Sequence, residues 1–273
     1  MRWLNIVLIA VILSAKGFAQ EYLIIDTVQY SFMYEYSFQR DSLSKGTPSF
    51  QSMMLQVGQQ FSRFSPHRDI VADSILCDKT KKVSINDVLA ATGNSKISNL
   101  CKYNIYKDYP SKGSAVFTSF LNRNDRYIVK QKLAFDWNIA SESDTIIMGY
   151  QCNMATTFFA GRLYKAWFTQ QIPLPEGPYK FGGLPGLIVK ISDSKNQHVF
   201  LLTGIYKPVN ASIIYKSESF IPISAEKYVA ALEQSKNYAR DLIMGLNIAE
   251  EQKAKALYNL NIENNFIEKT NKK

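Results

Sequence analysis

The chain has 273 residues, of which 32 are Lys or Arg, 23 are Asp or Glu and 46% are hydrophobic. A chain of this size can bury a substantial core as a single all-β or α+β domain. Its positive charge is spread along the sequence without a dense basic run, which argues against a nucleic-acid partner. Scattered lysines keep a surface soluble, and attraction to an anionic lipid or polyanion is the functional alternative.

The N-terminus has the order of a secretory signal peptide. Arg2 precedes an apolar run from Ile6 to Leu13, and Gly17-Phe18-Ala19 matches a small-x-small cleavage site. The run is far shorter than the roughly 20 residues that span a bilayer. We therefore predict a signal peptide over residues 1–19, a periplasmic or otherwise exported protein, and no transmembrane span after cleavage. The exported chain keeps 30 basic and 23 acidic residues, a net charge of +7.

The first segment after the cleavage site alternates between apolar and polar residues. The apolar positions are Val28, Tyr30, Phe32, Tyr34, Tyr36 and Phe38. This alternation predicts one long strand with one buried face, and a strand of this length must twist, so a strongly curved sheet is expected. The aromatic stripe forms part of the core or lines a ligand cavity.

The pattern weakens further along the chain. A short strand is predicted to break at Gly58 and a second strand or turn to follow over residues 61–64. Ser84 is placed to cap a short helix that ends at Gly93. The tyrosines that precede Pro110 predict an excursion packed on the domain by its aromatic rings; they are Tyr103, Tyr106 and Tyr109.

From Ala115 onward the sequence reads as consecutive strands joined by short turns, which must pair antiparallel. The predicted strands are Tyr127–Trp137, Asp144–Met148, Tyr150–Phe159, Arg162–Thr169, Leu187–Ile191, His198–Lys207 and an edge strand at Ile213–Tyr215.

The period then changes to that of a helix, with Ser224 as its predicted cap and a second helix over Ala249–Tyr258. The first helix places an apolar stripe at helical spacing: Tyr228, Leu232, Ser235, Ala239, Leu242 and Leu246. We predict that it covers one face of the sheet. The expected fold is α+β, a strongly curved, mostly antiparallel half-barrel with helices packed on one face. Residues 20–260 form one domain in this prediction, and residues 261–273 a frayed polar tail.

The three cysteines are Cys77, Cys101 and Cys152. An exported location permits disulfides, and Cys77 with Cys101 is the first pairing to expect, while Cys152 is expected in the core. No CxxC motif occurs, and the two histidines are far apart. The sequence therefore predicts no metal site and no cofactor.

The most tightly specified backbone lies between Gly177 and Ile191, where glycine and proline are concentrated. Leu184 stands between turn residues, so it is expected to plug into the core or an opening in it. The loop either closes one end of the sheet or gates a cavity and presents a partner surface. The candidate binding or docking residues are Trp167, Lys180, Leu184, Pro185 and Asp193.

Residues Gly183 to Ile188 spell Gly-Leu-Pro-Gly-Leu-Ile, and ordered matches extend across the region from Trp137 to Asp193. This block resembles the GLPGLI family of exported Bacteroidetes proteins, which implies export but no established activity. It is more distantly similar to lipoprotein-carrier-like domains, whose curved antiparallel sheet closes over helices to hold apolar cargo.

Two functions remain. One is a non-catalytic envelope protein that binds an apolar ligand, lipid or peptide in the concave sheet, or docks on an outer-membrane partner. The alternative is an envelope hydrolase with an unrecognised site. No Gly-x-Ser-x-Gly elbow or HExxH motif is present. Three charged residues lie near the signature, namely Glu176, Lys180 and Asp193.

Overall fold

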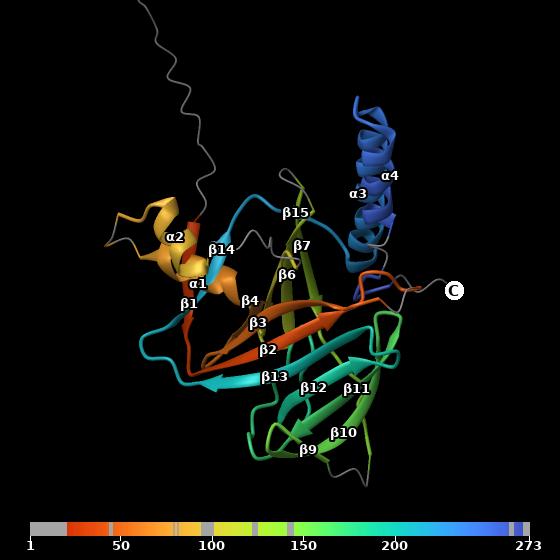
Figure 1. Cartoon of the computed structure of the whole chain (residues 1–273). Helices are drawn as coiled ribbons and strands as arrows, with labels where there is room; N and C mark the ends of the chain where they lie inside the picture. The colour runs from red at the N-terminus through yellow and green to blue at the C-terminus, as the bar shows by residue number, and fades with distance from the viewer. Residues whose placement is uncertain are drawn as a thin grey trace, which may run out of the picture.

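A computed structural model describes residues 21–43, 46–78, 80, 82–93, 101–121, 125–140, 145–261 and 265–269. The predicted signal peptide therefore lies outside the described residues. Figure 1 shows an open, strongly curved sheet with two helices on one side and a helical hairpin on the other. The described part contains no helix long and apolar enough to cross a bilayer.

The large sheet has the strand order β15-β7-β6-β5-β4-β3-β2-β13-β12-β11-β10-β8, with β9 paired to β10. All of its pairs are antiparallel except β15 with β7. Its strands are β2 (Tyr30–Phe38), β3 (Ser49–Val57), β4 (Ser62–Pro66), β5 (Tyr103–Lys107), β6 (Ser114–Phe120), β7 (Arg126–Lys132), β8 (Asn138–Ile139), β9 (Thr145–Ile147), β10 (Tyr150–Phe159), β11 (Arg162–Thr169), β12 (Leu187–Asp193), β13 (His198–Tyr206) and β15 (Ile221–Pro222). The predicted α+β fold with a curved, mostly antiparallel sheet is confirmed.

The remaining elements lie beside this sheet. Strands β1 (Glu21–Thr27) and β14 (Ser212–Ser217) form a separate antiparallel pair. The helices are α1 (His67–Cys77), α2 (Ile85–Thr92), α3 (Ala225–Gly245) and α4 (Glu250–Asn261).

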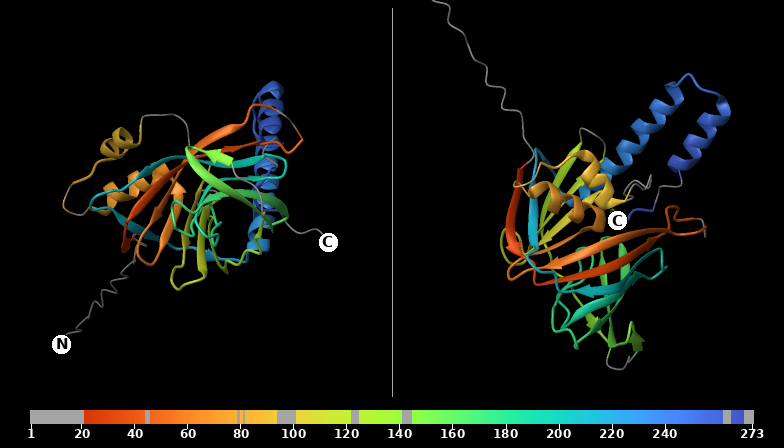
Figure 2. Two further views of the ribbon diagram at one scale, coloured as in Figure 1. Left: turned by 90° about the horizontal axis from the view of Figure 1, so that it is seen from below. Right: turned by 60° about the vertical axis from the view of Figure 1, so that its left-hand side comes forward.

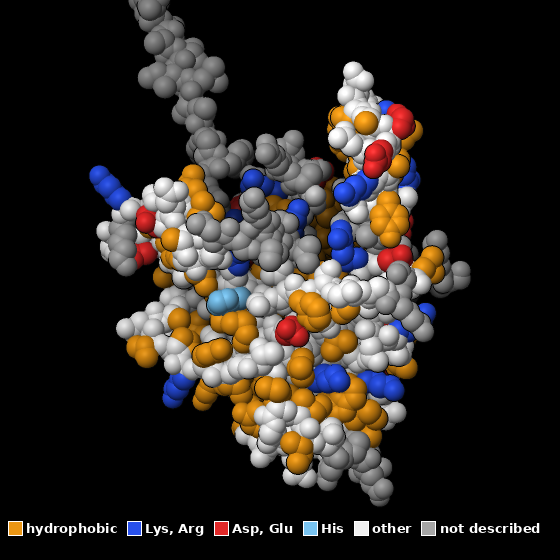
Figure 3. All heavy atoms as spheres, in the orientation of Figure 1, with side chains coloured by type: hydrophobic (Ala, Val, Ile, Leu, Met, Phe, Trp, Pro, Cys, Tyr) orange, Lys and Arg blue, Asp and Glu red, His pale blue; other side chains and the backbone are white. Residues whose placement is uncertain are grey.

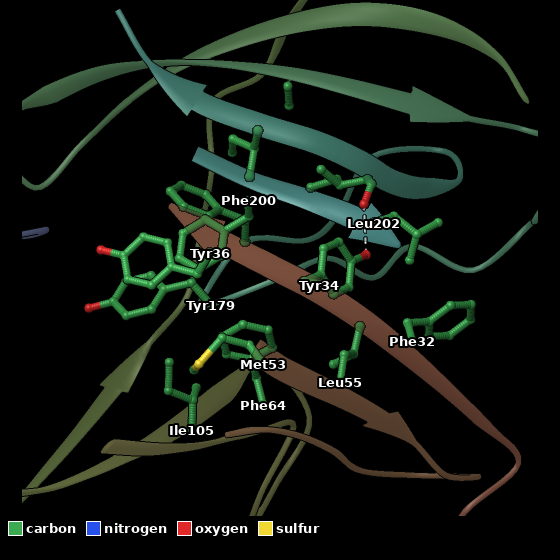
Figure 4. Close-up of a cluster of buried hydrophobic side chains, with 14 of the residues drawn as sticks. Phe32, Tyr34, Tyr36, Met53, Leu55, Phe64, Ile105, Tyr179, Phe200 and Leu202 are labelled. Carbon is green, nitrogen blue, oxygen red and sulfur yellow. Dashed lines mark hydrogen bonds between the residues drawn. The ribbon is translucent and has the colours of Figure 1, made fainter. Parts of the chain in front are cut away.

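The long first strand of the prediction is divided into β1 and β2. The break lies beside Asp26, whose carboxylate accepts hydrogen bonds from the backbone N–H groups of Thr27, Gln60 and Phe61. This turn directs β1 to β14 and β2 into the large sheet. The aromatic alternation holds over the middle of β2, where Phe32, Tyr34 and Tyr36 are buried (Figure 4), but not at its start, where Tyr30 is exposed and Ser31 buried.

The concave side of the sheet is filled by the connection between β11 and β12, residues 170–186, which we call the signature loop. Its side chains Tyr179, Phe181 and Leu184 are buried in the main core. The chain after β7 also leaves the sheet to reach this loop, since Phe135 lies 5.5 Å from the ring of Phe181. The predicted strand to Trp137 therefore ends at Lys132 because its last aromatic residues pack inside the half-barrel.

Helix α3 begins at the predicted cap, where the Ser224 hydroxyl accepts from Lys227 N. Its N-terminal half faces the body, where Tyr228 and Val229 are buried and Leu232 packs against the core. The Tyr228 hydroxyl donates to Ser119 Oγ on β6 at 2.8 Å. Beyond this anchor, α3 and α4 project from the body as a hairpin (Figure 2).

Three further expectations from the sequence are wrong. Tyr103–Lys107 is strand β5 of the large sheet, not an excursion. The Cys77–Cys101 disulfide is not formed, because all three cysteines are free; Cys152 is buried, as predicted. The expected frayed end is wrong for residues 265–269, which pack on the body, as described below.

Candidate functional site

The signature loop is held from below by a buried lysine of β5. Lys107 forms an ion pair with Glu176, and its Nζ donates to the carbonyls of Gly177 at 2.9 Å and Phe181 at 3.1 Å. Trp137 Nε1 donates to Gly182 O at 2.9 Å from another side. These bonds satisfy carbonyls of a backbone that could not otherwise be buried.

Close backbone packing explains the glycines of the loop. A Cβ on Gly186 would lie 2.1 Å from Thr169 O, and one on Gly177 would lie 2.7 Å from the Ile188 side chain. The Tyr34 hydroxyl donates to Ile188 O at 2.7 Å just beyond the loop. The loop therefore packs closely against β11 and β12, and Leu184 plugs into the core as the sequence predicts.

The five residues singled out in the sequence do not share one environment. Leu184 lies in the core, and Pro185 is exposed. Trp167 is half-buried, with Lys190 Nζ 4.9 Å from the centroid of its ring. Lys180 and Asp193 are both buried in ion pairs. Two of the five therefore belong to networks that involve the end of the chain.

The first network contains Lys180, Tyr179 and Glu268. Lys180 Nζ lies 2.5 Å from Glu268 Oε1, and the Tyr179 hydroxyl donates to the same oxygen at 2.7 Å. Lys180 Nζ is also 4.8 Å from the centroid of the Phe117 ring. Burial, followed by the negative charge of Glu268, raises the pKa of Tyr179 well above its usual range, so its hydroxyl stays protonated.

The second network contains Arg162 and Asp193. Asp193 pairs with Arg162 Nη1 at 2.9 Å and accepts the backbone N–H groups of Gln197 and His198. The same guanidinium donates through Nη2 to Asn265 Oδ1 at 2.6 Å and to Phe266 O at 2.7 Å.

Residues 265–269, which we call the C-terminal segment, are therefore held at several points. Besides the bonds from Arg162 and Lys180, the Tyr164 hydroxyl donates to Ile267 O, and Lys269 N donates to Ala160 O. Asn265 also contacts the end of β2, because its side chain donates to the carbonyl of Gln39, the residue after that strand. The segment therefore joins the end of β2 and the start of β11 to the signature loop.

A cavity of about 350 Å³ lies between this segment, α3 and the concave sheet; we call it the aromatic cavity. Figure 4 shows the Tyr36 and Tyr179 hydroxyls pointing to the same side of the core, away from Tyr34. Both tyrosines line the cavity, as do the residues Phe38, Cys101, Lys102, Tyr103, Phe117, Ser119, Phe120, Leu121, His198, Tyr228, Val229, Leu232, Ser235, Lys236, Ala239, Leu260, Asn265, Phe266, Ile267 and Glu268.

The polar groups deep in this cavity are uncharged. Burial, together with the positive charges of Arg162 and Lys269, lowers the pKa of His198 to about 3, so its imidazole is neutral. Its Nδ1 lies 2.7 Å from the Tyr36 hydroxyl. Burial raises the pKa of the Cys101 thiol to about 12, so it is no thiolate nucleophile at neutral pH. The lining is therefore mostly apolar, with neutral hydrogen-bonding groups beside the ionisable side chains of Lys102, Lys236 and Glu268.

A second cavity of about 260 Å³ lies beside the signature loop. Of its charged lining residues, Lys107, Glu176 and Lys180 are engaged in ion pairs, and Asp108 accepts a hydrogen bond from Gly113 N. Within the described ranges, no three His, Cys, Asp or Glu side chains gather in a way that could hold a metal ion.

Sequence reasoning anticipated the aromatic stripe of β2, of which Tyr36 and Phe38 line the cavity. It also anticipated the helical stripe of α3, whose members from Tyr228 to Ala239 form another wall. It missed the C-terminal segment, because a short polar stretch carries no periodicity. The signal that could have found it is the pair Phe266 and Ile267, two adjacent large apolar residues in a mostly polar tail.

Comparison with known proteins finds a family-model match over one short segment and no activity. Residues 160–190 match the family model described as "Protein of unknown function (Porph_ging)". The match contains the Gly183–Ile188 hexapeptide and confirms the family resemblance over this segment. No curated protein matches the chain.

Two solved structures are similar in fold. They are described as "Structure of PNGF-II in P21 space group" and "Structure of PNGF-II in C2 space group", with TM-scores of 0.48 and 0.46 and 16% sequence identity each. The alignments cover 77% and 80% of this chain and 34% of each of those chains. This chain thus spans about a third of the length of the solved structures that it matches.

Proposed function

We propose that this protein is an exported, non-catalytic binding protein that holds an acyl chain or similar apolar part of a lipid in the aromatic cavity. The observation that carries the proposal is the lining of that cavity. Its volume of about 350 Å³ falls within the roughly 300–1,000 Å³ of small-molecule sites, which are mostly apolar with a few placed polar groups.

The depth of the cavity favours an uncharged part of the ligand. Tyr36, Tyr103 and Phe117 supply aromatic wall, and the nearby His198 imidazole is neutral. Removing apolar ligand surface from water contributes about 25 cal/mol per Å². An alkyl chain gains this free energy without leaving a buried charge unpaired.

The cations in the lining favour a ligand whose polar end is neutral or anionic. Lys102, the residue before β5, is exposed, and Lys236 lies on α3. Among the described lining residues the one carboxylate is Glu268, and Lys180 already neutralises it. A cationic head group would find no uncompensated carboxylate among these residues. A fatty acid or an anionic lipid fits better.

The test uses residues 20–273 and a matched pair of α3 variants. Ala239→Trp fills the cavity from its half-buried wall, whereas Gln234→Trp adds the same ring at an exposed position of the same helix. We expect a fluorescent fatty acid to bind the wild type and the Gln234→Trp variant with affinities within about twofold. Binding to Ala239→Trp should be at least about tenfold weaker, a loss of about 1.4 kcal/mol.

Native mass spectrometry of protein purified without detergent gives an independent readout. A co-purifying lipid mass that Ala239→Trp lacks would support the proposal. Absence of both a bound lipid and fatty-acid binding in the folded wild type would overturn it. Turnover of the bound molecule would instead favour the hydrolase alternative.

A further inference from the structure

The α3–α4 hairpin exposes an unusual amount of apolar surface at its free end. Residues 242–249 read Leu-Ile-Met-Gly-Leu-Asn-Ile-Ala and contain no charged side chain; we call them the hairpin tip. Leu242, Met244, Leu246 and Ile248 are 53%, 58%, 50% and 38% exposed. Single exposed hydrophobic residues are ordinary on a protein surface, but a contiguous uncharged group of this kind marks an interaction site.

The tip is convex and stands away from the rest of the molecule. Figures 2 and 3 show the hairpin rising from the body, with hydrophobic side chains on its surface. A convex apolar end needs a partner that deforms around it or that already has a matching pocket. A bilayer surface deforms in this way, since apolar helical surfaces enter it by about 5–10 Å.

The tip is also continuous with the wall of the aromatic cavity. Leu232, Ser235 and Ala239 line that cavity, and Leu242 and Leu246 continue the same stripe of α3 at helical spacing. At about 1.5 Å per residue, the stripe runs only about 10 Å from Ala239 to Leu246. An apolar chain that leaves a bilayer at the tip could therefore follow one helix face into the cavity.

The charges beside the tip do not oppose a lipid surface. Lys236 and Arg240 precede the tip on α3, and Lys253 and Lys255 follow it on α4, interspersed with Asp241, Glu250 and Glu251. The exported chain as a whole carries +7, which favours anionic lipids over cationic ones. Because the tip itself is uncharged, insertion rather than ion pairing would provide the lasting contact.

We propose that the hairpin tip inserts into the surface of a lipid bilayer and so brings the mouth of the aromatic cavity to the membrane. This contact goes beyond ligand binding in the cavity and depends on different residues. It identifies a lipid surface as the partner, in preference to a second copy of the chain.

The test is co-sedimentation of residues 20–273 with vesicles of phosphatidylethanolamine and phosphatidylglycerol. The tip variant carries Leu242→Ser, Met244→Ser and Leu246→Ser. The matched control carries Ile146→Ser, Phe158→Ser and Leu163→Ser, which replace exposed hydrophobic residues of β9, β10 and β11. We expect the wild type and the control to bind alike and the tip variant to bind at least about tenfold more weakly.

Two further measurements distinguish insertion from simple attraction. At about 0.5 M salt, where charges are screened within a few Å, wild-type binding should persist. A Leu246→Trp variant should show blue-shifted emission with vesicles, whereas Phe158→Trp should not. Circular dichroism checks that each variant is folded.

Several results would overturn the proposal. They are no binding by the folded wild type, equal binding by the tip and control variants, or complete loss of binding at high salt. A concentration-dependent dimer that the tip variant abolishes, without any vesicle binding, would assign the tip to a second copy instead. Failure of the membrane contact and failure of the cavity can be separated, because the tip variant should still bind the fluorescent fatty acid in solution.

Discussion

The signature loop and the α3–α4 hairpin are both rich in large apolar side chains, but the loop buries them and the hairpin exposes them. Tyr179, Phe181 and Leu184 of the loop are fully buried, whereas Tyr238 and Leu242 of the hairpin are 62% and 53% exposed. The loop is held by buried cations and by carbonyl hydrogen bonds from several strands. The hairpin is held at one end by Tyr228 and Val229. The motif that is easiest to recognise is therefore architecture, and the apolar surface free for contacts lies elsewhere.

The largest effect should come from removing the lysine beneath the loop. Lys107→Met leaves the Glu176 carboxylate without its cation and two loop carbonyls without their donor. Breaking a buried pair in this way costs about 3–5 kcal/mol, which urea unfolding monitored by circular dichroism would measure.

A double-mutant cycle provides the control for this prediction. Because Glu176→Gln removes the stranded charge, the double variant Lys107→Met/Glu176→Gln should be more stable than Lys107→Met alone. A loss below about 1 kcal/mol for Lys107→Met would show that the ion pair does not hold the loop.

The second prediction compares the loss of stability when either of two loop glycines with different surroundings is replaced by alanine. Gly186→Ala places its Cβ 2.1 Å from the Thr169 carbonyl oxygen, whereas Gly183→Ala meets no atom within 4 Å. Gly183 has a φ of 86°, so alanine there costs about 1–2 kcal/mol from backbone strain alone.

Gly186→Ala should cost more, about 2–4 kcal/mol, because strand backbone must also move. Thermal unfolding of the two variants side by side measures the difference. Equal melting temperatures would contradict the close approach of the loop to β11.

These two regions also show which parts of the molecule could be predicted from sequence. The antiparallel strands were predicted because period-2 patterns and short turns are local, and β10 and β11 begin and end where expected. The cap of α2 was likewise local: Ser84 and Asp87 form the capping box. The apolar stripe of α3 and the buried position of Leu184 were read from spacing alone.

What could not be predicted depends on contacts distant in sequence. Strand β5 reads as an excursion because all five of its residues are buried, so its polar and apolar positions do not alternate. Helix α1 was missed because it buries only Ile70 and Asp73 and thus has little apolar pattern. The pairing of Lys180 with Glu268 joins residues 88 positions apart, and nothing local indicates it.

A smaller effect depends on pH and concerns His198, where the aromatic cavity meets the Arg162 network. In the folded chain its pKa is about 3, below the ordinary 6.5, so the unfolded chain takes up a proton first as pH falls. Stability should therefore decline as pH decreases from about 6.5 toward 3, by at most about 1.4 kcal/mol per pH unit for this one proton.

The His198→Gln variant isolates this contribution, because the Gln side chain is polar and does not titrate. The difference in unfolding free energy between wild type and variant, measured in urea near pH 7 and near pH 5, should shift in favour of the variant by about 2 kcal/mol. A constant difference at the two pH values would mean that the imidazole protonates freely in the folded protein. In that case the groups around the imidazole do not prevent its protonation. These groups are Tyr36, Arg162, Asp193, Asn265 and Lys269.

The smallest change in the free energy of unfolding is expected at the hairpin, and a small change there is as informative as the large changes at the loop. Leu242→Ser replaces a half-exposed side chain and should change the free energy of unfolding by less than about 0.5 kcal/mol. Amide hydrogen exchange should be slow near Tyr228 and rapid across the hairpin tip, because the buried side chains of α3 lie near its start. A loss above about 1 kcal/mol would show that another part of the chain covers this surface. A negligible loss, together with weakened vesicle binding in the tip variant, would mean that the apolar residues at the tip serve contact with a partner and not the stability of the fold.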